Sequence, residues 1–174
     1  NEKEKYSTCR KHRSFWLRIF GIDCGSRHTG YGVIETDGRC HQALAFGVIS
    51  VLPASPFPAR LKKIYSELET LVVEHKPDAV AIEEVFYAVN VRTALKLAQV
   101  RGVALLLAAQ AELPVGEYSP LAIKKSVVGY GRADKKQVQM MVASLLSLRQ
   151  PIRSADAADA LAVAICHSQF RALG

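Results

Sequence analysis

Four acidic residues stand where their carboxylates could meet in one site. Asp23 and Glu83 each end a short apolar run, while Asp156 and Asp159 are three residues apart in an alanine-rich segment. On an α-helix this i, i+3 spacing places both carboxylates on one face. Carboxylates gathered in one place repel each other, and their hard oxygen atoms suit divalent cations such as Mg²⁺ or Mn²⁺. The residues therefore favour a metal site built from oxygen ligands alone.

Such a site has a known chemical use. Two divalent ions roughly 4 Å apart can activate a water molecule and stabilise the leaving 3′ oxygen of a phosphodiester. Each acidic element is common by itself, because many strands end in Asp and many helices carry solvated acids. Here the surrounding alanines would let the acidic helix approach a sheet closely, which an ordinary solvated face does not require. The combination favours metal-dependent phosphodiester hydrolysis.

The elements that must position these acids follow from the apolar patterning. Strands are predicted at 17–22, 29–35, 43–51, 79–82 and 115–118, and helices around 61–72, 91–111, from Ser119-Pro120 onward, 134–148 and 154–170. Asn90 and Ser119 are plausible N-caps. This order predicts an α/β layer with a mixed five-stranded sheet flanked by helices. If the first and fourth strands are parallel neighbours, Asp23 and Glu83 emerge at the same edge.

Composition narrows the class of protein. The 174 residues suffice for one domain, predicted at 17–174, after a flexible basic extension over 1–16. The net charge of +7 favours a polyanionic partner, most often nucleic acid. No apolar run is long enough to span a bilayer, which argues against a membrane role. The four cysteines form no CxxC pair, so free thiols in the cytoplasm are expected.

Three segments resemble motifs of the bacterial RuvC resolvases. They are 21–32 (GIDCGSRHTGYG), 81–86 (AIEEVF) and 155–160 (ADAADA), and the resemblance extends in order over about 17–168. It implies an RNase H-like fold and a Mg²⁺-dependent homodimer that nicks opposing strands of a four-way (Holliday) junction in DNA recombination and repair. The acids themselves favour two ions per active site. The catalytic and metal-binding acids that it implies are Asp23, Glu83, Asp156 and Asp159.

Two residues depart from the family pattern. Cys24 stands where the family usually has Pro, and we expect it to loosen the first turn. Glu84 stands where Gln is familiar and adds a fifth acid beside the site. Because neighbouring residues of a strand point to opposite faces, we expect Glu84 to point away from the other acids.

The resemblance also implies contacts to DNA. It places a base-stacking wedge at Phe86 and basic contacts at Lys124 and Lys135. Arg132 belongs to the same basic segment around the glycine loop 129–131, which suits phosphate binding. His167, on the last predicted helix, is interpreted as a packed residue rather than a proton shuttle.

The predicted helix 91–111 is apolar on more than one face toward its end. Two faces of such a helix have to be buried, and we expect the sheet to cover one face and a second subunit to cover the other. The family resemblance further implies a branch-migration helicase as partner.

Three other interpretations were weighed. One is an RNase H-like nuclease that acts on RNA–DNA hybrids or on branched DNA generally, and another is a catalytically inactive DNA-binding dimer. Segment 23–26 also resembles a phosphate loop of actin-like ATPases, but those enzymes need two lobes, which 174 residues cannot supply.

Overall fold

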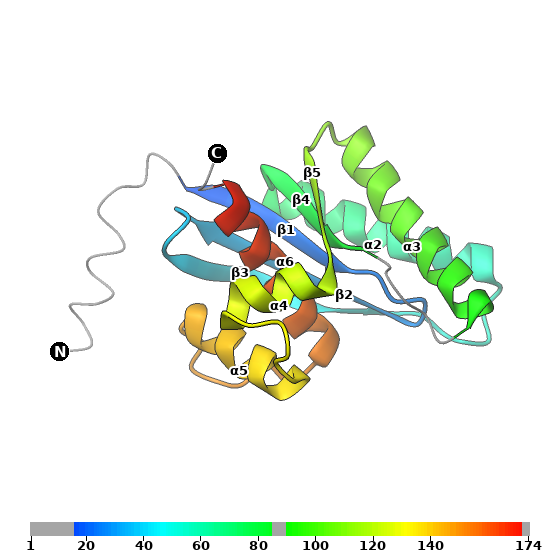
Figure 1. The fold of residues 1–174 in the computed structure, drawn as a ribbon. Helices are drawn as coiled ribbons and strands as arrows, with labels where there is room; N and C mark the ends of the chain where they lie inside the picture. The colour runs from blue at the N-terminus through cyan, green and yellow to red at the C-terminus, as the bar shows by residue number, and fades with distance from the viewer. Residues whose placement is uncertain (1–15, 85–89, 172–174) are drawn as a thin grey trace.

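A computed structural model describes residues 16–84 and 90–171 of the chain. Phe86 and nearly all of the predicted extension 1–16 lie outside the described residues. Figure 1 shows a sheet with helices on both of its faces. The elements are β1 (Leu17–Asp23), β2 (His28–Thr36), β3 (His41–Ser50), α2 (Phe57–His75), β4 (Ala79–Glu83), α3 (Val91–Gln110), β5 (Val115–Tyr118), α4 (Pro120–Val128), α5 (Lys135–Leu145) and α6 (Ala155–Arg171).

The sheet is mixed, as the sequence predicts. Its strands lie in the order β3-β2-β1-β4-β5. β2 runs antiparallel to both β1 and β3, whereas β4 runs parallel to both β1 and β5. The predicted parallel pairing of the first and fourth strands is therefore confirmed, and the carboxyl ends of β1 and β4 share one edge of the sheet.

Two hydrophobic cores cover the two faces of the sheet. Along β1, Ile19 belongs to the core beneath α4, α5 and α6, while Phe20 and Ile22 belong to the core beneath α2 and α3. Helix α6 is the most deeply buried helix, and its residues 160–166 are each 0% exposed. A helix buried to this extent is held in one position by its packing, so any polar side chain on its sheet-facing side is held with it.

Two predicted helix starts are confirmed by their caps. The Asn90 side chain accepts a hydrogen bond of 2.9 Å from the backbone N–H of Thr93. The Ser119 hydroxyl accepts one of 3.3 Å from Ala122, and Pro120 occupies the first helical position, where its missing N–H costs nothing.

The cysteines differ in part from expectation. Cys24 and Cys166 are free and buried, but Cys40 is disulfide-bonded, so the expectation of free thiols is wrong for Cys40. Among the described helices, none combines the length and the apolar character needed to cross a bilayer.

Candidate active site

Asp23 and Glu83 lie side by side on the α6 face of the sheet. In the parallel β1–β4 register Ile22 pairs with Ile82, so the next residue of each strand is one of these two acids. Neighbouring strands are about 4.8 Å apart. Ile22 and Ile82 point into the core beneath α2 and α3. Because strand residues alternate between faces, both carboxylates point toward α6.

Glycines of the sheet bring Asp156 to the same place. Gly30 is the cross-strand partner of Asp23, and a Cβ on Gly30 would lie 2.0 Å from the backbone oxygen of Asp156. A Cβ on Gly21 would likewise lie 2.1 Å from the backbone oxygen of Ala160. The first turns of α6 thus rest directly on strand backbone. Our sequence reasoning credited the alanines with this close approach and missed the strand glycines, although a glycine within a strand signals close backbone contact.

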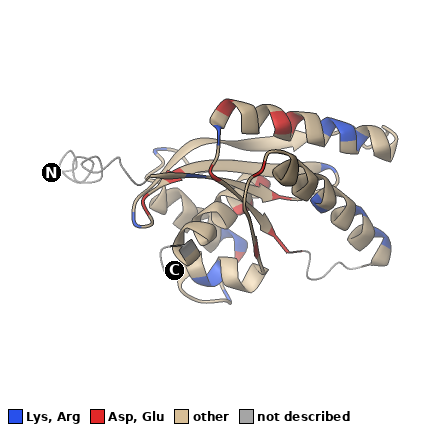
Figure 2. Ribbon diagram, turned by 90° about the horizontal axis from the view of Figure 1, so that it is seen from above, with Lys and Arg blue, Asp and Glu red and all other residues tan. Residues whose placement is uncertain are grey.

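The acids repel one another electrostatically. The pKa of Asp23 is raised to about 7, chiefly by burial and then by the charges of Glu83, Asp159 and Asp156, while Lys135 opposes them. Burial and then Asp159 also raise the pKa of Glu83. All four predicted catalytic acids therefore contribute to one electrostatic cluster. Figure 2 shows Asp and Glu segments on strands in the middle of the molecule, with Lys and Arg segments on helices to either side.

Two of the predicted basic contacts border these acids. The Lys135 ammonium donates a hydrogen bond of 3.3 Å to Asp159, and the pKa of Lys135 rises, chiefly because of that carboxylate. Lys124 on α4 lowers the pKa of Glu83 through its charge. Arg132 is exposed in the segment between α4 and α5. The site is thus an acidic cluster with cations on its α4–α5 side.

The acids do not form a closed set of metal ligands. Among residues 16–84 and 90–171, no three Asp, Glu, His or Cys side chains are arranged so that they could hold one ion. Asp159 is instead engaged by Lys135.

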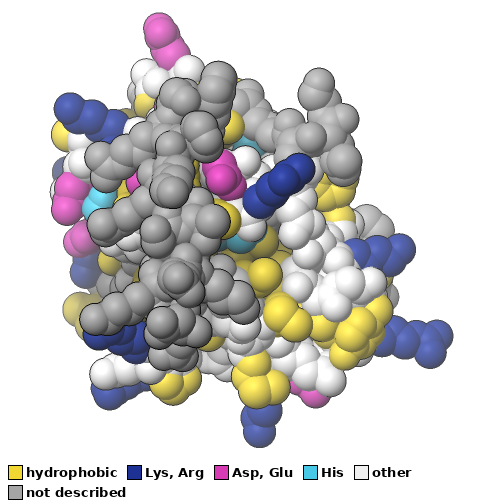
Figure 3. All heavy atoms as spheres, turned by 90° about the vertical axis from the view of Figure 1, so that its left-hand side faces the viewer, with side chains coloured by type: hydrophobic (Ala, Val, Ile, Leu, Met, Phe, Trp, Pro, Cys, Tyr) yellow, Lys and Arg dark blue, Asp and Glu magenta, His cyan; other side chains and the backbone are white. Residues whose placement is uncertain are grey.

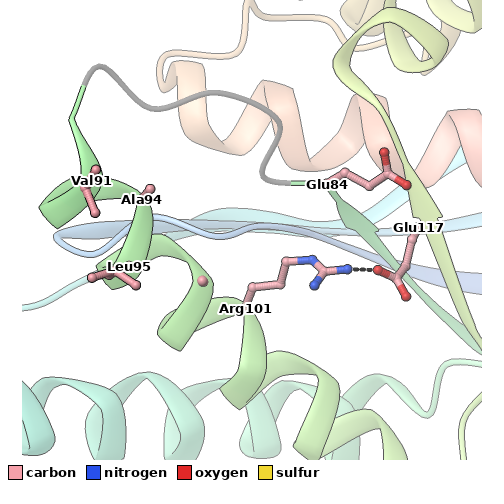
Figure 4. A pocket seen from close by; sticks show the side chains of 7 residues that line it. Glu84, Val91, Ala94, Leu95, Arg101 and Glu117 are labelled. Atoms are coloured by element: carbon pink, nitrogen blue, oxygen red, sulfur yellow. Dashed lines mark ion pairs between the residues drawn. The ribbon is translucent and has the colours of Figure 1, made fainter.

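The Glu84 prediction is confirmed. Its side chain lies on the opposite face of the sheet, in a pocket with α3 and with the ion pair formed by Arg101 and Glu117 (Figure 4). The other departure, Cys24, is buried in the core beneath α2 and α3, and this burial raises the pKa of its thiol to about 12. The turn after Asp23 is stabilised by Thr29, whose hydroxyl donates a hydrogen bond of 2.8 Å to the Gly25 carbonyl.

His167 is a packed residue, as predicted. It is 5% exposed, and its Nδ1 lies 2.8 Å from the Tyr118 hydroxyl. The predicted wedge, Phe86, falls outside the described residues.

The family model described as "Crossover junction endodeoxyribonuclease RuvC" matches residues 19–167. The chain belongs to the RuvC family. The RuvC of Koribacter versatilis is 52% identical, covering 87% of this chain and 92% of that protein. The RuvC of Acidobacterium capsulatum is 54% identical over the same shares of 87% and 92%.

Solved structures agree with this membership. T. thermophilus RuvC in complex with Holliday junction substrate is 31% identical with a TM-score of 0.87, covering 91% of this chain and 96% of that chain. The yeast mitochondrial Holliday junction resolvase Ydc2 has a TM-score of 0.64 at 15% identity, covering 90% and 79%, and this likeness concerns the fold alone. The RNase H-like fold predicted from the RuvC resemblance is confirmed.

Proposed function

We propose that the protein is a divalent-metal-dependent endodeoxyribonuclease that resolves four-way (Holliday) DNA junctions in recombination and repair. The observation that carries this is the meeting of Asp23, Glu83, Asp156 and Asp159 at one sheet edge in a RuvC-family chain. The relatives are named crossover junction endodeoxyribonucleases, and one solved relative is described in complex with Holliday junction substrate.

The four carboxylates would hold two Mg²⁺ ions, and Mn²⁺ would be able to replace Mg²⁺. The raised pKa values of Asp23 and Glu83 support this, because a cation between the carboxylates would replace repulsion by attraction. Bound ions would supply Lewis-acid stabilisation of the attacking water and of the leaving 3′ oxygen. Asp23 and Glu83 would hold the ions from the strands, and Asp156 and Asp159 from the buried helix.

The remaining residues of the site would bind and orient the DNA. Hydrolysis adds a water oxygen to phosphorus and breaks the P–O3′ bond, so the 3′ oxygen leaves as a hydroxyl after gaining a proton. Lys135, already 3.3 Å from Asp159, would hold that carboxylate and place a positive charge beside the phosphate. Lys124 and Arg132 would extend the basic border along α4 and the following loop.

A homodimer would present two such sites to opposing strands. Its support is an exposed stripe on α3 that includes Val91 and Leu95, 75% and 59% exposed, and Leu106, 54% exposed. Gly102 lies on the same stripe, and a Cβ there would meet nothing within 4 Å. Exposed apolar residues at helical spacing favour burial against a second copy. A branch-migration helicase partner stays a prediction of the family resemblance, and a cytoplasmic location stays a prediction from the cysteine pattern.

The deciding experiment is Mg²⁺-dependent cleavage of a synthetic four-way junction beside duplex, flap and RNA–DNA hybrid substrates. We expect symmetric nicks in the junction alone, and no cleavage by Asp23→Asn. Equal cleavage of flaps or hybrids would instead favour a general RNase H-like nuclease. Junction binding without any metal-dependent cleavage would favour an inactive DNA-binding dimer.

The predicted wedge has its own test. Phe86→Ala should weaken junction cleavage while leaving metal binding intact, because stacking on an unpaired base contributes about 1–3 kcal/mol. Unchanged cleavage would remove Phe86 from the proposed DNA contacts.

A further inference from the structure

A groove runs along the β3 edge of the sheet, beside the start of α6. It has a volume of about 410 Å³ and is lined by β3 residues 46–48, by residues 148–153 of the α5–α6 loop, and by Ser154 and Ala157. Its walls are partly apolar, with Phe46 and Val48 on the strand side. Of the predicted DNA contacts, the three that the structure describes, Lys124, Arg132 and Lys135, do not line this groove.

The groove begins one strand beyond the acidic cluster. Asp23, Gly30 and Val48 form a row across β1, β2 and β3, because Gly30 pairs with both of the others. Asp156 lies over Gly30, and the residue after it, Ala157, lines the groove. With strands about 4.8 Å apart, Val48 is about 10 Å from Asp23. The groove therefore lies within a few nucleotides of the acidic cluster, since the charges of one DNA strand recur about every 3.4 Å of helix axis.

Two arginines give the groove its charge. Arg149 and Arg153 both line it and are exposed, and neither forms an ion pair with an acid of the described residues. By contrast, Arg101 forms an ion pair with Glu117, and Lys135 forms one with Asp159. Two unneutralised guanidinium groups beside a phosphodiester-cleaving site favour an anionic occupant. Figure 3 shows Lys and Arg side chains next to hydrophobic ones along the right and lower margins of the face that it draws.

We propose that this groove holds the sugar–phosphate backbone of the DNA strand that runs from the active site toward β3, with Arg149 and Arg153 each contacting a phosphate. The proposal rests on the proposed nuclease function. The apolar walls at Phe46 and Val48 suit deoxyribose and base surfaces, which an isolated phosphate ion would not offer. The arginines are positioning residues, because they contact the strand away from the phosphate that is cut.

The expected effect follows from counterion release. Each phosphate contact contributes about 0.9 to the magnitude of the slope of log affinity against log salt, which is roughly an eightfold change in affinity for each tenfold change in salt concentration. The double variant Arg149→Gln/Arg153→Gln should therefore lower the slope for junction binding by about 1.8. The variant Arg149→Lys/Arg153→Lys keeps both charges and should retain the slope.

The test is the affinity for a synthetic four-way junction in metal-free buffer at several salt concentrations. The matched control is Lys62→Gln/Lys63→Gln, which removes two exposed charges from α2 on the opposite face of the sheet. A lower slope for the arginine variant alone supports the proposal. A slope equal to that of the wild type, or an equal loss in the control, overturns it. Junction cleavage by the wild type is measured in parallel, and its absence would overturn the proposed nuclease function instead.

Discussion

Replacing Asp23 with Asn should stabilise the metal-free protein even though it abolishes cleavage. The pKa of Asp23 is raised from 3.8 to about 7 by burial and by the neighbouring acids. The folded protein therefore binds this proton more tightly than the unfolded chain does, and folding is penalised at every pH at which the carboxyl of the unfolded chain is ionised. The penalty reaches about 4 kcal/mol at pH 8, falls to about 2 kcal/mol at pH 5.5, and disappears below pH about 4.

The assay is urea unfolding in EDTA at pH 8 and at about pH 4. We expect Asp23→Asn to raise the free energy of unfolding by about 2–4 kcal/mol at pH 8 and by little at the lower pH. Glu67→Gln on α2 is the control, since an exposed substitution changes stability by about 0.5 kcal/mol or less. Saturating Mg²⁺ should stabilise the wild type more than the variant, because ligand binding to the folded state adds to its stability.

Either of two results would refute this reasoning. If Asp23→Asn and the wild type unfold at the same urea concentration at pH 8 without metal, burial and the neighbouring acids do not penalise the ionised Asp23 in the folded protein. An equal gain at both pH values would also contradict it, because a gain from relieved ionisation has to vanish once the carboxyl is protonated.

Four further outcomes are expected. Gly30→Ala should cost about 3 kcal/mol of stability and nearly all cleavage, because its Cβ would lie 2.0 Å from the Asp156 oxygen; wild-type unfolding and cleavage curves would contradict this. Glu84→Gln should leave the cleavage rate within about twofold, as its side chain faces α3, and a tenfold loss would return it to the site. Lys135→Gln should lower the salt slope of junction binding by about 1. At limiting Mg²⁺, cleavage by the wild type should rise as the pH passes about 7, where Asp23 ionises, and a flat pH profile would argue against Asp23 as a ligand.

Much of the fold could be predicted because the positions of strands and helices depend on patterns among residues that are close in the sequence. The alternation of apolar residues places β1 to β5 within a few residues of their observed bounds, and the caps at Asn90 and Ser119 start their helices as expected. The strand-end positions of Asp23 and Glu83 and the helical spacing of Asp156 and Asp159 are local as well. Face alternation in β4 likewise predicted the side on which Glu84 lies.

What the sequence by itself determined is the set of acids and the elements that carry them, since periodicity, caps and strand ends depend on near neighbours. Only the tertiary structure decided that α6 rests on Gly21 and Gly30, and that Lys135 reaches Asp159 across 24 positions of sequence. It also decided the pKa of Asp23, because desolvation and Coulomb repulsion depend on distances between segments far apart in the chain. The tertiary structure also decided the groove that Arg149 and Arg153 line, because this groove forms only where β3 and the loop before α6 lie side by side.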